Sequence, residues 1–166
     1  MVSIKGILVF LSISLSFFIT FNVQARITPE DIVQAKRAAY EKRVASYSAV
    51  HKQALIKLSE DIAAVNKKRT DQLDRIMEVQ AAILDEYERR ENGKDAENIK
   101  TARYWVTYAH EAVAYQAAKI YIFDLSSEGN IKSDANSTIN LFQSELNSTR
   151  SKVIYSQKIL QGVVGK

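Results

Sequence analysis

The two histidines are the first residues to consider for metal or acid–base chemistry. His110 and Glu111 begin the His-Glu-x-x-His pattern of zinc peptidases, but Ala114 stands where the second histidine would be. Di-iron bundles need a Glu three residues before a His, and this chain has Ser48 and Thr107 at those positions. Neither metal-binding motif is therefore complete.

We expect both histidines at the edge of the hydrophobic core, hydrogen-bonded to polar neighbours. His51 falls on the apolar stripe of the first predicted helix, and His110 falls on that of the second. A non-covalent haem held by His and Met77 is an alternative, and it requires a four-helix bundle. A pH-sensitive contact is another alternative, because imidazole titrates near neutral pH.

Residues 124–135 resemble the calcium loop of an EF-hand. Asp124, Ser126 and Glu128 occupy the first, third and fifth ligand positions of that loop. The twelfth position, which supplies a bidentate Glu in an EF-hand, is Ala135, and Lys132 brings a positive charge to the ninth. We therefore interpret the segment as a polar turn and keep its three possible ligands as a weak calcium site.

No other pattern for catalysis or cofactor binding is present. The chain has no cysteine, which excludes thiol nucleophiles, iron–sulfur clusters, covalent haem and cysteine zinc sites. It also has no glycine-rich phosphate loop. We expect a protein that is not an enzyme and that carries no cofactor, although folding can bring distant residues together.

The second predicted helix carries an aromatic face opposite its apolar stripe. At about 100° per residue the stripe holds Ile99, Val106, Val113, Ala117 and Ile120. The other side holds Tyr104, Tyr108, Tyr115 and Ile122, with Trp105 nearby. Tyrosine and tryptophan suit a binding surface because they bury a large area and keep a polar tip. We expect this face to bind a partner, unless helices flank it on both sides.

Three helices account for the rest of the chain, at about residues 29–91, 95–123 and 134–163. Thr28 and Pro29 are typical of a helix start, and Asn92-Gly93 is typical of a helix end. Between them the apolar stripe advances in steps of three and four residues. It comprises Val33, Tyr40, Val44, Tyr47, His51, Leu55, Leu58, Ile62, Val65, Leu73, Ile76, Ile83 and Tyr87.

A polar stretch interrupts this stripe at residues 66–72 and places Arg69 on it. Because no Gly or Pro marks a break, we favour a continuous helix. The fold class predicted is all-α, an antiparallel helical bundle or coiled coil with one long N-terminal helix and two shorter ones. The alternative is a four-helix bundle with a break near Asn66.

Charge is unevenly divided along the first predicted helix. Residues 30–57 carry six basic and three acidic side chains, whereas residues 58–92 carry six basic and nine acidic ones. Antiparallel self-association would bring opposite charges together, and a solvated helix face is the simpler interpretation. The formal net charge of +4 is too small to indicate nucleic-acid binding.

The N-terminus has the pattern of an export signal. A basic start with Lys5 precedes an apolar run that ends near Phe21, and Val23 and Ala25 satisfy the small-residue rule for cleavage. We predict a signal peptide at residues 1–25 and a single helical domain at residues 26–166. An uncleaved anchor is the alternative, and after cleavage we expect no stable membrane span.

These observations predict a periplasmic or secreted, non-enzymatic interaction protein. We expect it to bind a protein partner or a second copy of itself through its long helix faces, as a scaffold or a chaperone-like envelope protein does. The alternative is a four-helix bundle that binds a small ligand, haem or a metal ion around an inward-facing His110.

Overall fold

The computed structural model describes residues 28–91 and 94–165, and these form helices and connecting segments without any strand. The helices are α1 (Pro29–Val44), α2 (Ala49–Glu91), α3 (Ala96–Ala117), the short 3₁₀ helix η1 (Glu128–Asn130) and α4 (Ile131–Val164). The predicted all-α helical bundle is confirmed. The predicted signal peptide lies outside the described residues and stays a prediction.

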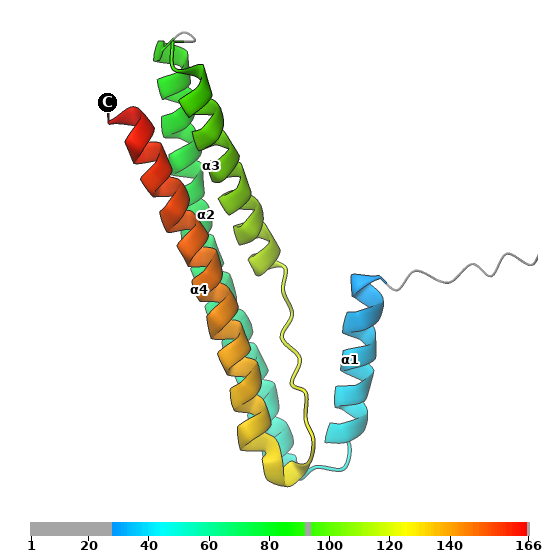
Figure 1. Ribbon diagram of the computed structural model, residues 1–166. Coiled ribbons are helices and arrows are strands. Elements are labelled where there is room, and N and C mark those ends of the chain that lie inside the picture. The colour runs from blue at the N-terminus through cyan, green and yellow to red at the C-terminus, as the bar shows by residue number, and fades with distance from the viewer. Residues whose placement is uncertain (1–27, 92–93, 166) are drawn as a thin grey trace, which may run out of the picture.

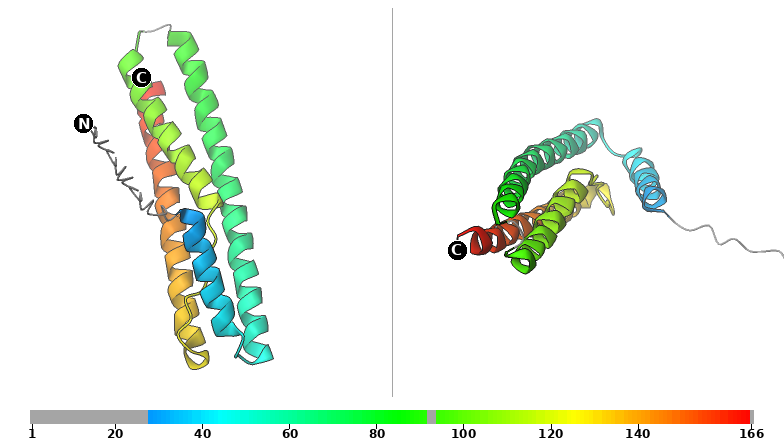
Figure 2. Two further views of the ribbon diagram at one scale, coloured as in Figure 1. Left: turned by 90° about the vertical axis from the view of Figure 1, so that its right-hand side faces the viewer. Right: turned by 90° about the horizontal axis from the view of Figure 1, so that it is seen from above.

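The bundle has two unequal halves (Figures 1 and 2). Helices α2 and α4 run side by side in the same direction, and α3 packs against both in the opposite direction. Because α3 is much shorter than α2, it covers only one half, which we call the α3 half. Residues 118–127 then continue in the direction of α3 as an extended connector along the other half, the connector half, and α1 lies beside this connector.

Helix α1 begins where the sequence predicts. The backbone amide of Asp31 donates to Thr28 Oγ1, and the amide of Thr28 donates to the carboxylate of Asp31. This reciprocal capping box satisfies two amides that a helix start leaves free, and Pro29 occupies the first helical position.

The prediction of one helix over residues 29–91 is wrong at residues 45–48, where the chain turns between α1 and α2. The turn satisfies its own backbone: the Ser46 hydroxyl donates to the carbonyl of Arg43, and Lys52 Nζ donates to the carbonyl of Ala45. Turning here also buries Tyr47, which is only 6% exposed. Local polar bonds and the burial of one aromatic ring therefore replace a turn of helix.

The predicted continuity through residues 66–72 is confirmed, because α2 is helical from Ala49 to Glu91. The inward positions are Asn66 and Thr70, both buried, and Arg69 is exposed. The placement of Arg69 on the buried stripe is therefore wrong. The Thr70 hydroxyl donates to the carbonyl of Asn66, so this inward group is satisfied within the helix.

Helix α3 ends at Ala117, not near residue 123 as predicted. The connector that follows buries Phe123 and Leu125, which fill the space that α3 leaves empty in the connector half. Helix α4 starts at Ile131, a few residues before the expected start. Its N-cap residue Asn130 makes no side-chain cap bond, and the carboxylate of Asp134 in the first turn accepts hydrogen bonds from the amide and hydroxyl of Ser126.

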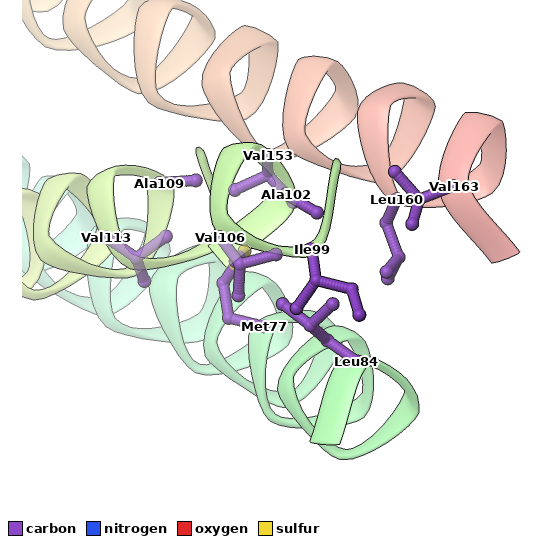
Figure 3. Close-up of a cluster of buried hydrophobic side chains, with 10 residues drawn as sticks. All are labelled: Met77, Leu84, Ile99, Ala102, Val106, Ala109, Val113, Val153, Leu160 and Val163. Atoms are coloured by element: carbon purple, nitrogen blue, oxygen red, sulfur yellow. The ribbon is translucent and has the colours of Figure 1, made fainter. Parts of the chain in front are cut away.

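Each half has its own hydrophobic cluster. In the α3 half, side chains from α2, α3 and α4 converge, as Figure 3 shows, and Met77, Leu84 and Val113 among them are essentially fully buried. In the connector half, Leu55 and Phe142 pack with the buried connector residues. Within the residues that the structure describes, no helix is both long and apolar enough to cross a membrane.

Candidate binding surface on helices α3 and α4

Trp105 anchors an aromatic cluster at the boundary between α3 and α4. Its ring is partly buried and meets Tyr155 of α4 edge-on, with ring centroids 4.6 Å apart and planes at 75°. Edge-to-face contact is a favoured geometry for aromatic pairs, because the positive ring edge meets the negative face. The cluster therefore spans two helices and is held on a rigid base.

Tyr104 and Tyr108 complete the cluster on its solvent side. They lie one helical turn apart with parallel rings, at a centroid distance of 6.3 Å and an interplanar angle of 4°. Each also meets Trp105 edge-on, at 5.2 Å and 5.8 Å. Tyr104 is 61% exposed, so most of its surface is available to another molecule.

Charged side chains of both signs surround this aromatic cluster. Lys152 Nζ of α4 lies 5.0 Å from the centroid of Tyr108, within range of a cation–π interaction. On the other side, Arg103 pairs with Asp85 at 2.8 Å and with Glu88, both on α2. Hydrogen bonds to these two carboxylates raise the pKa of Arg103 above its ordinary value.

A shallow depression of about 660 Å³ adjoins the two tyrosines on the α2 side. Glu88 of α2 forms one part of its wall, and residues of α3 form the rest, among them Lys100, Arg103, Tyr104, Thr107, Tyr108 and Glu111. It is open to solvent and mixes apolar ring faces with charged tips. This arrangement can accept a side chain of a partner.

The structure brings together three of the five predicted site residues. Tyr104, Trp105 and Tyr108 form the cluster. Tyr115 lies on the same helix but apart from it, 71% exposed, with Lys119 Nζ 4.9 Å from its ring centroid. Ile122 is not on this face, because α3 ends before it and the residue belongs to the connector.

Sequence reasoning missed Tyr155, the fourth ring of the cluster. The available signal was its position two residues after the buried Val153, which places an aromatic ring off the inward stripe of α4. That signal says the ring is not central in the core, but it does not say which helix lies beside it. Only the packing of α4 against α3 brings Tyr155 to Trp105.

A second exposed apolar surface was also missed. Ile76, Val79 and Ile83 of α2 are 42%, 58% and 44% exposed, although the first and last were predicted to be buried. With Leu160 and Val164 of α4 they line a groove of about 370 Å³. The true inward residues of α2 in this region are Met77, Gln80 and Leu84, so the predicted stripe was displaced around the helix.

The two histidines lie at the surface and each faces a carboxylate. His110 Nε2 is 2.9 Å from Asp74 Oδ1 of α2, and His51 Nδ1 is 2.7 Å from Glu128 Oε1. Both side chains are exposed, so their expected place at the edge of the core is wrong, and so is the inward-facing His110 of the alternative hypothesis. Hydrogen bonding to a polar neighbour is confirmed for both. Met77 is fully buried in the hydrophobic cluster of the α3 half.

Two of the three possible calcium ligands, Glu128 and Ser126, make structural hydrogen bonds instead. Glu128 accepts hydrogen bonds from the amide of Ser48 and from His51, which hold its pKa at about 2. Ser126 donates to Asp134, and Asp124 is exposed. Across residues 28–91 and 94–165 no group of three or more His, Asp or Glu residues is placed to hold a metal ion.

Comparison with known proteins adds no relative to this picture. No protein-family model, no curated protein and no solved structure matches the chain.

Proposed function

We propose that this chain is an exported, non-enzymatic interaction protein that docks a protein partner on the aromatic cluster of α3 and α4. The observation that carries the proposal is the pair of parallel, exposed tyrosines, Tyr104 and Tyr108, held in place by Trp105 and Tyr155. Rigid aromatic rings lose little conformational entropy when another molecule covers them, and they dominate the energetics of many protein interfaces.

The charge around the cluster supports a partner of particular chemistry. Basic Lys100 and Lys152 and acidic Glu111 border the rings, so an apolar or aromatic segment flanked by side chains of both charges complements this surface. The predicted signal peptide places the encounter in the periplasm or outside the cell. Export is tested by mass spectrometry of the chain recovered from the envelope or medium, which is expected to begin at Arg26.

The test begins with a photo-reactive amino acid at position 104 in cells, with the same group at Tyr115 as the matched control. The protein captured only from position 104 is then purified, and its affinity is measured by calorimetry. We expect Tyr108→Ala to weaken binding at least tenfold, because an anchor ring is lost. We expect Tyr115→Ala to change the affinity less than twofold.

Equal capture at both positions would contradict the proposal, and so would equal affinities for the two variants. Both substitutions remove an exposed tyrosine from the same helix, so a general loss of helix stability affects them alike. Circular dichroism of each variant confirms that the bundle is intact before binding is compared.

A further inference from the structure

Helix α1 is held to the rest of the molecule by few contacts. None of its residues is buried, and only Tyr40 and Val44 pack, partly buried, against the cluster of the connector half. Its main polar tether is Arg43, whose guanidinium donates to the carbonyl of Ser126. Depressions of about 130 Å³ and 340 Å³ remain beside it, so its packing against the connector is incomplete.

The turn between α1 and α2 has a sequence that also suits a helix. Residues 45–48 contain no Gly and no Pro. The stripe through Val44, Tyr47 and His51 keeps steps of three and four residues across the turn, as it does in a continuous helix. Local hydrophobic spacing therefore favours one helix over residues 29–91, and the turn is held by its own polar bonds together with contacts to distant residues.

The contacts with distant residues are the exposed hydrogen bonds to Glu128 and the burial of Tyr47 in the cluster of the connector half. The amide of Ser48 donates to Glu128 Oε1 at 2.7 Å, and His51 meets the same oxygen. Exposed polar contacts contribute little stability individually. Straightening the turn would give its backbone amides helical hydrogen bonds in exchange for these polar bonds, whereas the burial of Tyr47 favours the bent form.

If residues 29–91 form one straight helix, α1 cannot pack on the connector of its own chain. Its α1, 16 residues long, would extend about 24 Å beyond the end of the bundle at 1.5 Å per residue. Its Tyr40 and Val44 would then be exposed, and so would the connector surface around Phe123 that they cover. A second copy in the same form resolves both problems, because it offers the same vacated surface and the same free helix.

We propose that two copies of this chain exchange their α1 helices to form a symmetric dimer, each α1 packing on the connector of the other copy. The direction of α1 fits this exchange. In Figure 1, α1 runs toward the end of the bundle at which α2 begins. A helix that enters from a second copy placed at that end therefore runs in the same direction as the resident α1.

Charge favours the same pairing. The surface that receives α1 carries Asp124 and Asp134, whereas the facing side of α1 carries Lys36 and Arg43. Every contact of the resident helix is available to the incoming one. The dimer gains helical hydrogen bonds at the turn and loses the freedom of two separate molecules, so its population rises with concentration.

The absence of cysteine from the chain allows a direct test. Ala39 of α1 and Ile122 of the connector line the same depression. One copy carries Ala39→Cys, a second, differently tagged copy carries Ile122→Cys, and both are expressed with their own N-terminal segment and purified as the cell processes them. After joint incubation and treatment with a short bismaleimide, we expect a covalent heterodimer that carries both tags.

Ala49→Pro is the variant that permits the bent form and prevents the straight one. Proline suits the first position of α2 in the bent form, and it breaks a helix that continues from residue 45 to residue 53. We expect Ala49→Pro in both copies to reduce the heterodimer at least tenfold, with unchanged helix content by circular dichroism. Ala49→Ser, which permits both forms, is expected to retain it.

A chain that carries both Ala39→Cys and Ile122→Cys tests whether the bismaleimide can span the distance between these two positions. If this double variant cross-links within one chain while the mixed single variants give no heterodimer at any concentration, the exchange is overturned. Equal heterodimer yields from Ala49→Pro and Ala49→Ser also overturn it, because the contact between copies then does not depend on a straight helix.

Discussion

The side chain of Gln116 joins three parts of the chain at the level where α3 ends. Its amide donates to Asn66 Oδ1 of α2 at 3.0 Å and to the Tyr121 hydroxyl of the connector at 2.8 Å. The side-chain amide of Asn66 donates in turn to the backbone carbonyl of Gln116 at 3.0 Å. A buried network that is fully satisfied favours one arrangement over its alternatives, since every slipped register leaves polar groups without partners.

The network reaches the surface through Glu145 of α4. Tyr121 donates to this carboxylate at 2.6 Å, and Lys119 pairs with it at 2.7 Å. Burial, followed by the hydrogen bond to Glu145, raises the pKa of Tyr121 far above its ordinary value. Partial burial alone would raise the pKa of Glu145, but the bonds from Lys119 and Tyr121 outweigh it and lower that pKa.

Asn66→Ala tests how much this network stabilises the bundle. The substitution removes one hydrogen-bond partner from the side-chain amide of Gln116 and one from its backbone carbonyl. The expected cost is about 1–3 kcal/mol in the free energy of unfolding. Urea denaturation measures that cost. Asn147→Ala, at an exposed position of α4, is the matched control and is expected to change stability by less than about 0.5 kcal/mol. Equal effects of the two substitutions would show that the buried bonds contribute nothing.

At the scale of elements, the turn between α1 and α2 depends on a carboxylate far away in the chain. Glu128 accepts a hydrogen bond from the amide of Ser48, which is 80 residues earlier. The first amides of a helix have no partner within the helix, and the helix dipole is positive at this end. A carboxylate placed there stabilises the helix start, because it accepts a hydrogen bond from a free amide and carries a negative charge.

This contact predicts an acid-dependent loss of stability. The backbone bond from Ser48, followed by the bond from His51, lowers the pKa of Glu128 from 4.5 to about 2 in the folded chain. The folded pKa is below the unfolded one, so the contribution is present above 4.5 and is lost as the pH falls toward 2. Glu128→Gln removes this titration. Denaturation curves recorded across the acid range are expected to show a steeper decline for the wild type, and parallel declines would contradict the assignment.

Elements that depend on nearby residues were predictable from the sequence, and those that depend on distant residues were not. The start of α1 follows from Thr28 and Asp31, which cap each other across a single turn. The turn at residues 45–48 depends on Glu128, and the end of α3 depends on Phe123 and the connector packing. Neither contact leaves a local signal such as Gly or Pro.

The candidate site divides in the same way. Tyr104, Trp105 and Tyr108 share one face of one helix, so helical periodicity alone brings them together. Tyr155 joins them only through the packing of two helices, and Ile122 was placed with them on the assumption that α3 continued. Periodicity predicts the face of a helix, but it does not predict the neighbours of that face or the length of the helix.

At the scale of the whole molecule, the two halves differ in how their cores are built. The core of the α3 half comes from three packed helices, whereas the core of the connector half relies on an extended segment for Phe123 and Leu125 (Figures 1 and 3). Helix α1 adds no buried residue to either core. Resistance to local opening should therefore decrease from the α3 half to the connector half and then to α1.

Hydrogen exchange measured by mass spectrometry tests this order. At low protein concentration, where exchange of α1 between copies is least populated, we expect the amides of α1 to exchange first. Those of the connector follow, and those around Met77 and Val106 exchange last. Exposed helices open locally at little cost, while exposing the α3 half requires unfolding of the molecule. Equal protection of α1 and α3 would show that α1 belongs to the same cooperative unit, which its lack of buried residues argues against.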